Sequence, residues 1–173
     1  MRKLVHILLL PFAVTCSQPT KQPPSLVNFA HLEHLTEKIL LGGDSVSIVH
    51  IYSNYPDYRW VEAADSGPEG IACVDDAARA AVVYLRHYEL TGNLTSLIKA
   101  KSFLKFVLKM QAEDGKFYNF IFADHSINRD GKTSYKSFTW WAMRGVWSLS
   151  LGYRVFRQVD SGFASALKIA IDR

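Results

Sequence analysis

Carboxylates near the middle of the sequence are the side chains whose types and spacing best suit chemistry. Asp75 and Asp76 are adjacent, and further acids flank them at Asp65, Glu69 and Asp124. Hydrolysis of a glycosidic bond needs two carboxyl groups, one protonated as an acid and the other charged as a base or nucleophile. These five acids are the candidates for the two roles, and Asp76, Asp75 and Asp65 are the predicted catalytic residues.

Asp75 and Asp76 cannot both face one point if they lie on a helix, because neighbouring helical side chains project about 100° apart. A helix N-terminus stabilises a carboxylate, which suits a base better than a proton donor. Arg79 follows Asp75 by four residues and Asp76 by three, so a structural ion pair is an alternative interpretation. We expect Asp76 to face the site, because Ala80 and Val83 place it nearer the packed side of the helix.

Other chemistries fit the sequence less well. A magnesium-binding Asp-Asp-x-x-Asp motif would need an acid where this chain has Arg79. Residues 124–131 lack the ligand spacing of a calcium loop, and no phosphate-binding glycine loop or zinc pair is present. Cys73 has no histidine beside it and is interpreted as a small buried side chain. We therefore predict no metal and no cofactor.

The elements expected to position these residues are mainly helical. Residues 67–91 are predicted to form a turn and then an amphipathic helix, with apolar residues at three- and four-residue steps. Residues 93–111 form the next predicted helix, and because only Gly92 separates the two, we expect an antiparallel hairpin. Further helices are predicted over residues 26–41, 138–159 and 161–173, the last with Ser161 as a possible cap.

The segments between these helices are expected to meet at one end. Residues 46–64 predict two short strands or an extended hairpin with a turn at residues 54–57, and residues 117–122 are a candidate short strand. Since the helical hairpin closes at Gly92, the long loops lie together at its other end. They form one rim, whose predicted substrate-binding residues are Tyr58, Trp60, Glu69, Tyr118, Asn119, Asp124, Trp140 and Arg144.

The aromatic residues of this rim point to sugar. The face of an aromatic ring stacks on the apolar face of a pyranose, and rings beside carboxylates are typical of sugar-binding clefts. The alternative is that these rings belong to the core. Arg144 also has two interpretations: it binds the carboxylate of a uronic acid, or it is the buried partner of an aspartate.

Three segments occur in order at hairpin spacing: EGIACVDDAARAAVVYLRHYE, FLKFVLKMQAEDGKFYNFI and FTWWAMRGVWSLSLGY. Together they resemble the (α/α) toroid, or six-hairpin glycosidase-like, proteins of bacterial carbohydrate metabolism. The resemblance covers roughly residues 45–158 and implies helical hairpins arranged around a sugar-binding cleft. We therefore expect a mainly α fold over residues 26–173, the N-terminal part of an (α/α) toroid, with short β segments in the loops at one end.

This resemblance implies a carbohydrate-active protein of the glycoside hydrolase type, which acts on a poly- or oligosaccharide through paired carboxylates. A non-catalytic glycan-binding module and an inactive truncated fragment are the alternatives. The chain has a net charge of +4, of which Arg2 and Lys3 supply two charges. The remainder is too small to indicate a nucleic-acid partner.

The N-terminus has the pattern of an export signal. A short apolar run over residues 4–14 follows basic residues, which is typical of a secretory leader. The run ends at AVTC, which resembles a bacterial lipoprotein box, so we expect a signal peptide over residues 1–16, a lipid on Cys16 and a tether over residues 17–25. A plain secretory signal is the alternative. The expected location is the bacterial periplasm or the outer membrane, with a lipid anchor as the only contact with the membrane.

Overall fold

The computed structural model describes residues 27–173, so the predicted signal peptide, Cys16 and the tether lie outside the described residues. None of the helices in this part of the chain is long and apolar enough to cross a bilayer. In chain order the elements are α1 (Ala30–Leu35), β1 (Thr36–Leu41), β2 (Asp44–Val49), β3 (Tyr52–Asn54), β4 (Arg59–Val61), β5 (Ala72–Cys73), α2 (Val74–Thr91), α3 (Leu94–Lys109), β6 (Phe120–Ile121), α4 (Trp140–Phe156) and α5 (Ser161–Ile171).

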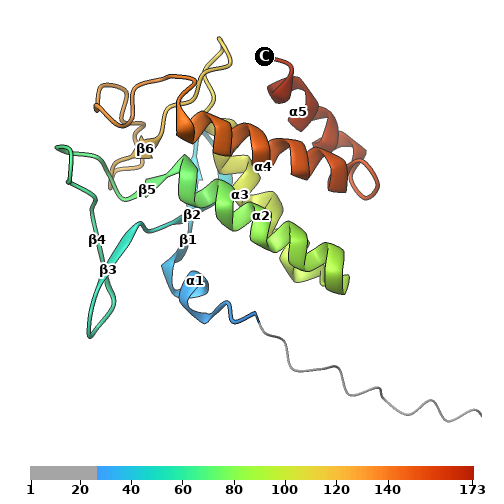
Figure 1. The fold of residues 1–173 in the computed structure, drawn as a ribbon, viewed down its shortest axis with the longest axis horizontal. Coiled ribbons are helices and arrows are strands. Elements are labelled where there is room, and N and C mark those ends of the chain that lie inside the picture. The colour runs from blue at the N-terminus through green and yellow to red at the C-terminus, as the bar shows by residue number, and fades with distance from the viewer. Residues whose placement is uncertain (1–26) are drawn as a thin grey trace, which may run out of the picture.

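The fold is a mixed α/β structure, and the expectation of a mainly α partial toroid is wrong. Residues 27–173 contain five helices and three small antiparallel sheets, β1–β2, β3–β4 and β5–β6. Figure 1 shows the longer helices α2 to α5 gathered together, with β5 and β6 beside the starts of α2 and α4. The strands are therefore a substantial part of the architecture and not only decoration of helical loops.

The segment over residues 26–41, predicted as one helix, accounts for part of this difference. Helix α1 is short, and β1 follows it directly. Gly42 and Gly43 have positive φ angles of 55° and 80°, which is the conformation of a two-residue hairpin turn. They join β1 to β2 as an antiparallel pair. Ile39 and Leu41 are both buried, so the apolar residues follow the period of a strand.

Helices α2 and α3 form the predicted antiparallel hairpin. Gly92 ends α2 in the left-handed conformation, with φ of 69°. The side chain of Asn93 then caps α3 by accepting a hydrogen bond from the amide of Ser96 at 3.1 Å. At the other end, the amide of Val74 donates to the carbonyl of Asn119 at 2.9 Å. The start of α2 therefore lies beside the chain that leaves α3.

Helix α4 lies beside α2 and runs in the same direction (Figure 1). Arg144 near the start of α4 lies 3.3 Å from Asp75 near the start of α2. Arg154 near the end of α4 lies 2.5 Å from Glu89 near the end of α2. The two N-terminal ends therefore open on the same side. Fully buried side chains from the four long helices fill the core, among them Leu85, Phe103, Leu149 and Leu167.

Helix α5 packs against α4 across a close contact at Gly152. A Cβ atom at this position would lie 2.6 Å from Leu104 and 3.2 Å from Leu167, so the absence of a side chain lets α3, α4 and α5 approach one another. Asp160 caps α5 by accepting a hydrogen bond from a first-turn amide at 3.0 Å. The predicted cap, Ser161, is instead the first residue of the helix.

The loop between α3 and α4 returns to the start of α2. There β6 pairs with β5 over two residues on each strand, and Trp141 Nε1 donates to the carbonyl of Phe117 at 2.8 Å. Gly70, just before β5, has φ of 145°, and a Cβ atom there would lie 2.1 Å from the carbonyl oxygen of Ile121. These contacts place parts of both long loops at one end of the helices.

Strands β3 and β4 form the predicted hairpin. Tyr52 pairs with Val61, and Ser53 pairs with Trp60. The turn lies at residues 55–58, between the two strands. Figure 1 shows this hairpin extending away from the helices.

Candidate active site

The predicted catalytic acids gather in one cleft at the N-terminal ends of α2 and α4. This cleft, which we call the acid cleft, has a volume of about 450 Å³. All three predicted catalytic residues and two of the predicted substrate-binding residues line it. The lining residues are Ile51, Tyr52, Ala63, Asp65, Ser66, Glu69, Cys73, Asp75, Asp76, Arg79, Phe120, Thr133 and Trp140.

Asp75 is a buried carboxylate held between two arginines, and its side chain is 10% exposed. Arg79 Nη2 donates a hydrogen bond to Oδ2. Arg144 Nε lies 3.3 Å from Oδ1, but the geometry is that of an ion pair without a hydrogen bond, so Oδ1 accepts none from the described residues. A buried charge needs partners, and the two guanidinium groups supply them. Asp75 Oδ1 is buried as well, so the carboxylate is enclosed between the two arginines.

Asp76 lies next to Asp75 but in a different environment. Burial raises its pKa, and the charge of Asp75 acts in the same direction, whereas the Cys73 thiol and Arg79 lower it. Arg79 Nη2 donates to Oδ1 at 2.9 Å, and Cys73 Sγ lies 3.3 Å from Oδ2. Burial therefore outweighs the helix N-terminus and the arginine, and Asp76 has the pKa shift expected of a proton donor.

Asp65 lies on the exposed side of the acid cleft. Tyr52 donates its hydroxyl hydrogen to Asp65 Oδ2 at 2.8 Å. This hydrogen bond raises the pKa of Tyr52, and the charge of Asp65 acts in the same direction. Tyr52 therefore remains a donor at neutral pH and fixes the position of the carboxylate.

Glu69 is structural in character, although sequence reasoning placed it among substrate-binding residues. One carboxylate oxygen accepts a hydrogen bond from the amide of Asp65 at 3.1 Å, and the other accepts one from the hydroxyl of Thr133. Asn128 also donates to the carbonyl of Glu69 at 2.8 Å. With both oxygens engaged, Glu69 connects the two loops that form the walls of the acid cleft.

Trp140 supplies an aromatic ring at the edge of the acid cleft. It is 54% exposed, and its ring meets the buried ring of Trp141 edge-on, with centroids 5.4 Å apart. The hydrogen bond from Trp141 Nε1 to the carbonyl of Phe117 fixes the ring of Trp141, and this ring supports that of Trp140. Trp140 therefore presents a supported aromatic surface beside the carboxylates.

Tyr58 and Trp60 do not join this cleft. Side chains alternate between the two faces of a strand, and Tyr52, which does line the cleft, pairs with Val61, whereas Trp60 pairs with Ser53. Trp60 therefore lies on the opposite face of the β3–β4 hairpin. The prediction placed Trp60 on the rim because it used the position of the hairpin in the chain and did not use the alternation of side chains along the strand.

Tyr118, Asn119 and Asp124 also lie outside the lining of the acid cleft. Arg129 stacks over the ring of Tyr118, 4.7 Å from its centroid. Asn119 is fully buried and donates to a loop carbonyl at 3.0 Å. Asp124 is exposed and accepts hydrogen bonds from Ser126, which lower its pKa. All three have local structural contacts, and Arg144 reaches the site only through its ion pair with an aspartate.

Sequence reasoning missed Tyr52 and Thr133 as components of the site. In the sequence, Tyr52 is one of several aromatic residues in a predicted strand. What sets it apart is that its side chain lies on the strand face that points toward the loop carrying Asp65. Thr133 lies in a loop without periodicity, so nothing in the local sequence predicted its contact with Glu69.

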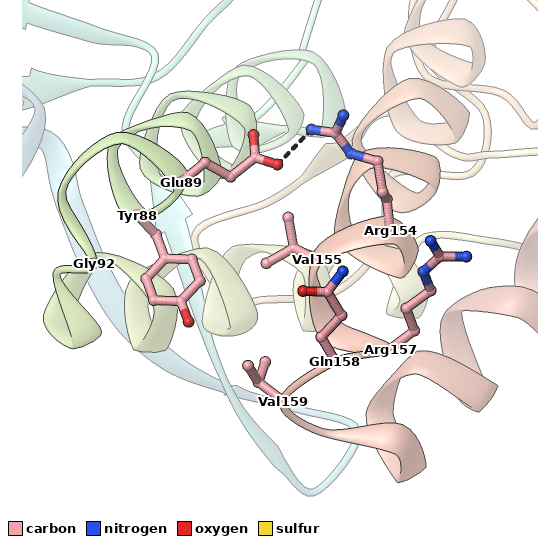
Figure 2. A pocket seen from close by; sticks show the side chains of 8 residues that line it. All are labelled: Tyr88, Glu89, Gly92, Arg154, Val155, Arg157, Gln158 and Val159. Atoms are coloured by element: carbon pink, nitrogen blue, oxygen red, sulfur yellow. Dashed lines mark hydrogen bonds and ion pairs between the residues drawn. The ribbon is translucent and has the colours of Figure 1, made fainter.

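A second hollow of about 540 Å³ lies at the other end of α2 and α4. Figure 2 shows Glu89 of α2 paired with Arg154 of α4 at its side, with Tyr88 nearby. Among the described residues that line it, Glu89 is the only acid. This hollow therefore lacks the two carboxyl groups that acid–base hydrolysis needs.

Comparison with known proteins adds no identity. No protein-family model matches this chain, and no curated protein matches it. Within residues 27–173, no three histidine, cysteine, aspartate or glutamate side chains gather as a metal site would require. The geometry of the acid cleft therefore carries the functional assignment.

Proposed function

We propose that the acid cleft hydrolyses glycosidic bonds in an oligo- or polysaccharide. The observation that carries this proposal is a pair of unlike carboxyl groups in one cleft: Asp76, whose pKa burial raises, and the exposed Asp65. Two carboxyl groups in contrasting environments are how a protein separates the roles of acid and base. Glycoside hydrolysis requires this separation.

Asp76 acts as the proton donor. It protonates the oxygen of the scissile bond as the bond from that oxygen to the anomeric carbon breaks. Asp65 takes the second role, either by attacking the anomeric carbon or by removing a proton from the water that does so. In both courses water supplies the hydroxyl group that ends on the anomeric carbon, and its remaining proton restores the protonation of the carboxyl groups.

The other residues of the acid cleft position the sugar and the acid. Arg79 donates to both Asp75 and Asp76, so it holds the proton donor in place. Trp140 stacks on the apolar face of the sugar ring. The export and membrane attachment predicted from Cys16 belong to the same proposal.

The test is release of reducing sugar from a panel of polysaccharides by the wild type and by Asp76→Asn. Asparagine keeps the shape but cannot donate the proton, so hydrolysis falls by about 10²- to 10⁴-fold while binding persists. Asp124→Asn is the matched control, because it alters an exposed aspartate outside the cleft. Undiminished hydrolysis in Asp76→Asn, or none in the wild type, overturns the proposal.

A second candidate is a glycan-binding module without turnover. The exposed ring of Trp140 favours it, since stacking on a sugar involves no proton transfer. It predicts binding of oligosaccharides by the wild type and by Asp76→Asn alike, loss of binding in Trp140→Ala, and no release of reducing sugar.

A further inference from the structure

The β3–β4 hairpin carries a group of exposed aromatic rings away from the acid cleft. Tyr55 is 83% exposed, and Tyr58 and Trp60 are each 44% exposed. We call these three residues the aromatic platform. Rings of this size are normally withdrawn from water, so a cluster of them on a projecting hairpin requires a structural or a binding explanation.

Trp60 is held in one orientation by contacts with His50 and His34. Its ring stacks on His50 with centroids 3.8 Å apart and an angle of 11°, and its Nε1 donates to the carbonyl of His34 at 3.1 Å. His50 is itself buried and lies 2.7 Å from Glu37 through Nε2. One face of Trp60 is therefore covered and its only donor is used. The His34 ring also lies near Trp60, tilted by 58° with centroids 6.4 Å apart, and the residue keeps the exposed area given above.

Tyr58 is fixed in a similar way. Its backbone has a positive φ of 52°, and His34 Nε2 donates to its carbonyl oxygen at 2.7 Å. Its ring meets Tyr55 and His31 edge-on, at centroid distances of 6.1 and 5.9 Å. Within the aromatic platform, Trp60 therefore has the least side-chain freedom to lose when a ligand covers it.

We propose that the aromatic platform is a second glycan-binding site, separate from the acid cleft, which binds a neutral polysaccharide by stacking on Trp60. This proposal rests on the proposed function only in that both take a carbohydrate as the ligand. Trp60 and the cleft residue Tyr52 lie on opposite faces of one hairpin. A polymer held by the platform therefore stays close to the cleft without occupying it.

The charge of the hairpin favours a neutral polymer over the other ligands that stack on or insert aromatic rings. Within residues 52–62, Arg59 is the only formal cation, and Asp57 and Glu62 are acidic. Binding to single-stranded nucleic acid combines stacking with a positively charged groove, and attachment to an anionic membrane needs a basic surface. The hairpin residues 52–62 provide neither feature, whereas a neutral sugar ring needs only an open aromatic face with polar groups around it.

The experiment is affinity electrophoresis of the full chain in gels that contain soluble β-glucan, xyloglucan, xylan, galactomannan or starch. The wild type is expected to be retarded by at least one polymer. Trp60→Ala is expected to weaken that retardation about tenfold, a factor typical of the loss of one stacked ring, and Trp60→Phe to restore part of it. Trp147→Ala is the matched control, because Trp147 on α4 is 45% exposed and lies outside both sites.

Three results overturn this inference: no retardation in any gel, equal losses in Trp60→Ala and Trp147→Ala, or a loss in Trp140→Ala with none in Trp60→Ala. Retention on phosphatidylcholine vesicles that depends on Trp60, without retardation by any polymer, assigns the platform to a membrane surface instead. Failure of the proposed hydrolysis in the acid cleft gives a different result. There, retardation still depends on Trp60, but the wild type releases no reducing sugar.

Discussion

Replacement of Gly70 by alanine tests whether the junction of β5 and β6 positions the acid cleft. Gly70 has φ of 145°, and a Cβ atom would lie 2.1 Å from the carbonyl oxygen of Ile121, where ordinary contacts begin at 3.4 Å. The obstacle is backbone, so no side-chain rotation relieves it. Either Gly70 or β6 must move by more than an ångström.

The cost follows from the interactions at this point. The carbonyl of Ile121 accepts a hydrogen bond from the amide of Ile71 at 2.9 Å, and the carbonyl of Gly70 accepts one from Ala63 at 2.8 Å. Losing both costs about 1 kcal/mol each, and a backbone conformation reserved for glycine adds about 1–3 kcal/mol. Gly70→Ala should therefore lower the free energy of unfolding by about 3–5 kcal/mol.

Urea denaturation followed by circular dichroism measures this loss. The matched control is Gly67→Ala, because Gly67 also has a positive φ, 101°, but no atom lies within 4 Å of its added Cβ. It should lose only the conformational part, about 1–3 kcal/mol. If Gly70→Ala is no less stable than Gly67→Ala, the close approach of Gly70 to β6 does not matter for stability, and the reasoning is refuted.

Three further outcomes are expected. Burial raises the pKa of Asp76, so the folded chain keeps that proton to a higher pH than the unfolded chain. The free energy of unfolding therefore falls as pH rises from the ordinary aspartate pKa through the raised pKa. Across this interval, Asp76→Asn should gain stability relative to the wild type in urea titrations. Burial also raises the pKa of the Cys73 thiol. In a Cys16→Ser background, 5,5′-dithiobis(2-nitrobenzoate) should therefore react with Cys73 only after unfolding. Rapid reaction in the native protein would contradict this. Leu104→Ala, at a fully buried position, should cost about 2–5 kcal/mol in thermal or urea unfolding, whereas Leu90→Ala, 84% exposed, should stay within about 0.5 kcal/mol of the wild type.

The helical part of the fold was predictable because its signals are local. The apolar stripe of α2, the stop at Gly92 and the direct continuation into α3 are all encoded within a few residues. They correctly predicted an antiparallel hairpin, and with it the meeting of Asp76 and Trp140 in one cleft. Local periodicity was sufficient for these elements.

The strands were harder to predict because short apolar runs fit more than one period. Residues 36–41 contain apolar positions compatible with a helix, and the deciding signal was the Gly42-Gly43 pair between two strands. A two-glycine turn between alternating segments predicts a hairpin, but the helix predicted over residues 26–41 also ends immediately before the same two glycines. The expectation of a mainly α toroid came from the three resembling segments, and the helix predicted over residues 26–41 was consistent with it.

The detailed site depended on contacts that no local pattern encodes. The link between Glu69 and Thr133 spans 64 residues, and Asp76 shares its cleft with Phe120, which comes from a loop on the far side of α3 in the sequence. Trp60 was predicted on the rim because its hairpin lies beside the cleft, but its side chain is on the opposite face of the hairpin from Tyr52. Prediction of the side-chain roles therefore required the long-range pairing itself.

The small ladder between β5 and β6 has a consequence for the order in which the protein is assembled. One wall of the acid cleft comes before α2 and the other comes after α3, and they touch through two residues on each strand. On the ribosome, the α2–α3 hairpin can close as soon as it emerges, because its contacts are local. The cleft cannot be complete until Trp140 has also emerged, so any activity it carries arises only after the α2–α3 hairpin can close.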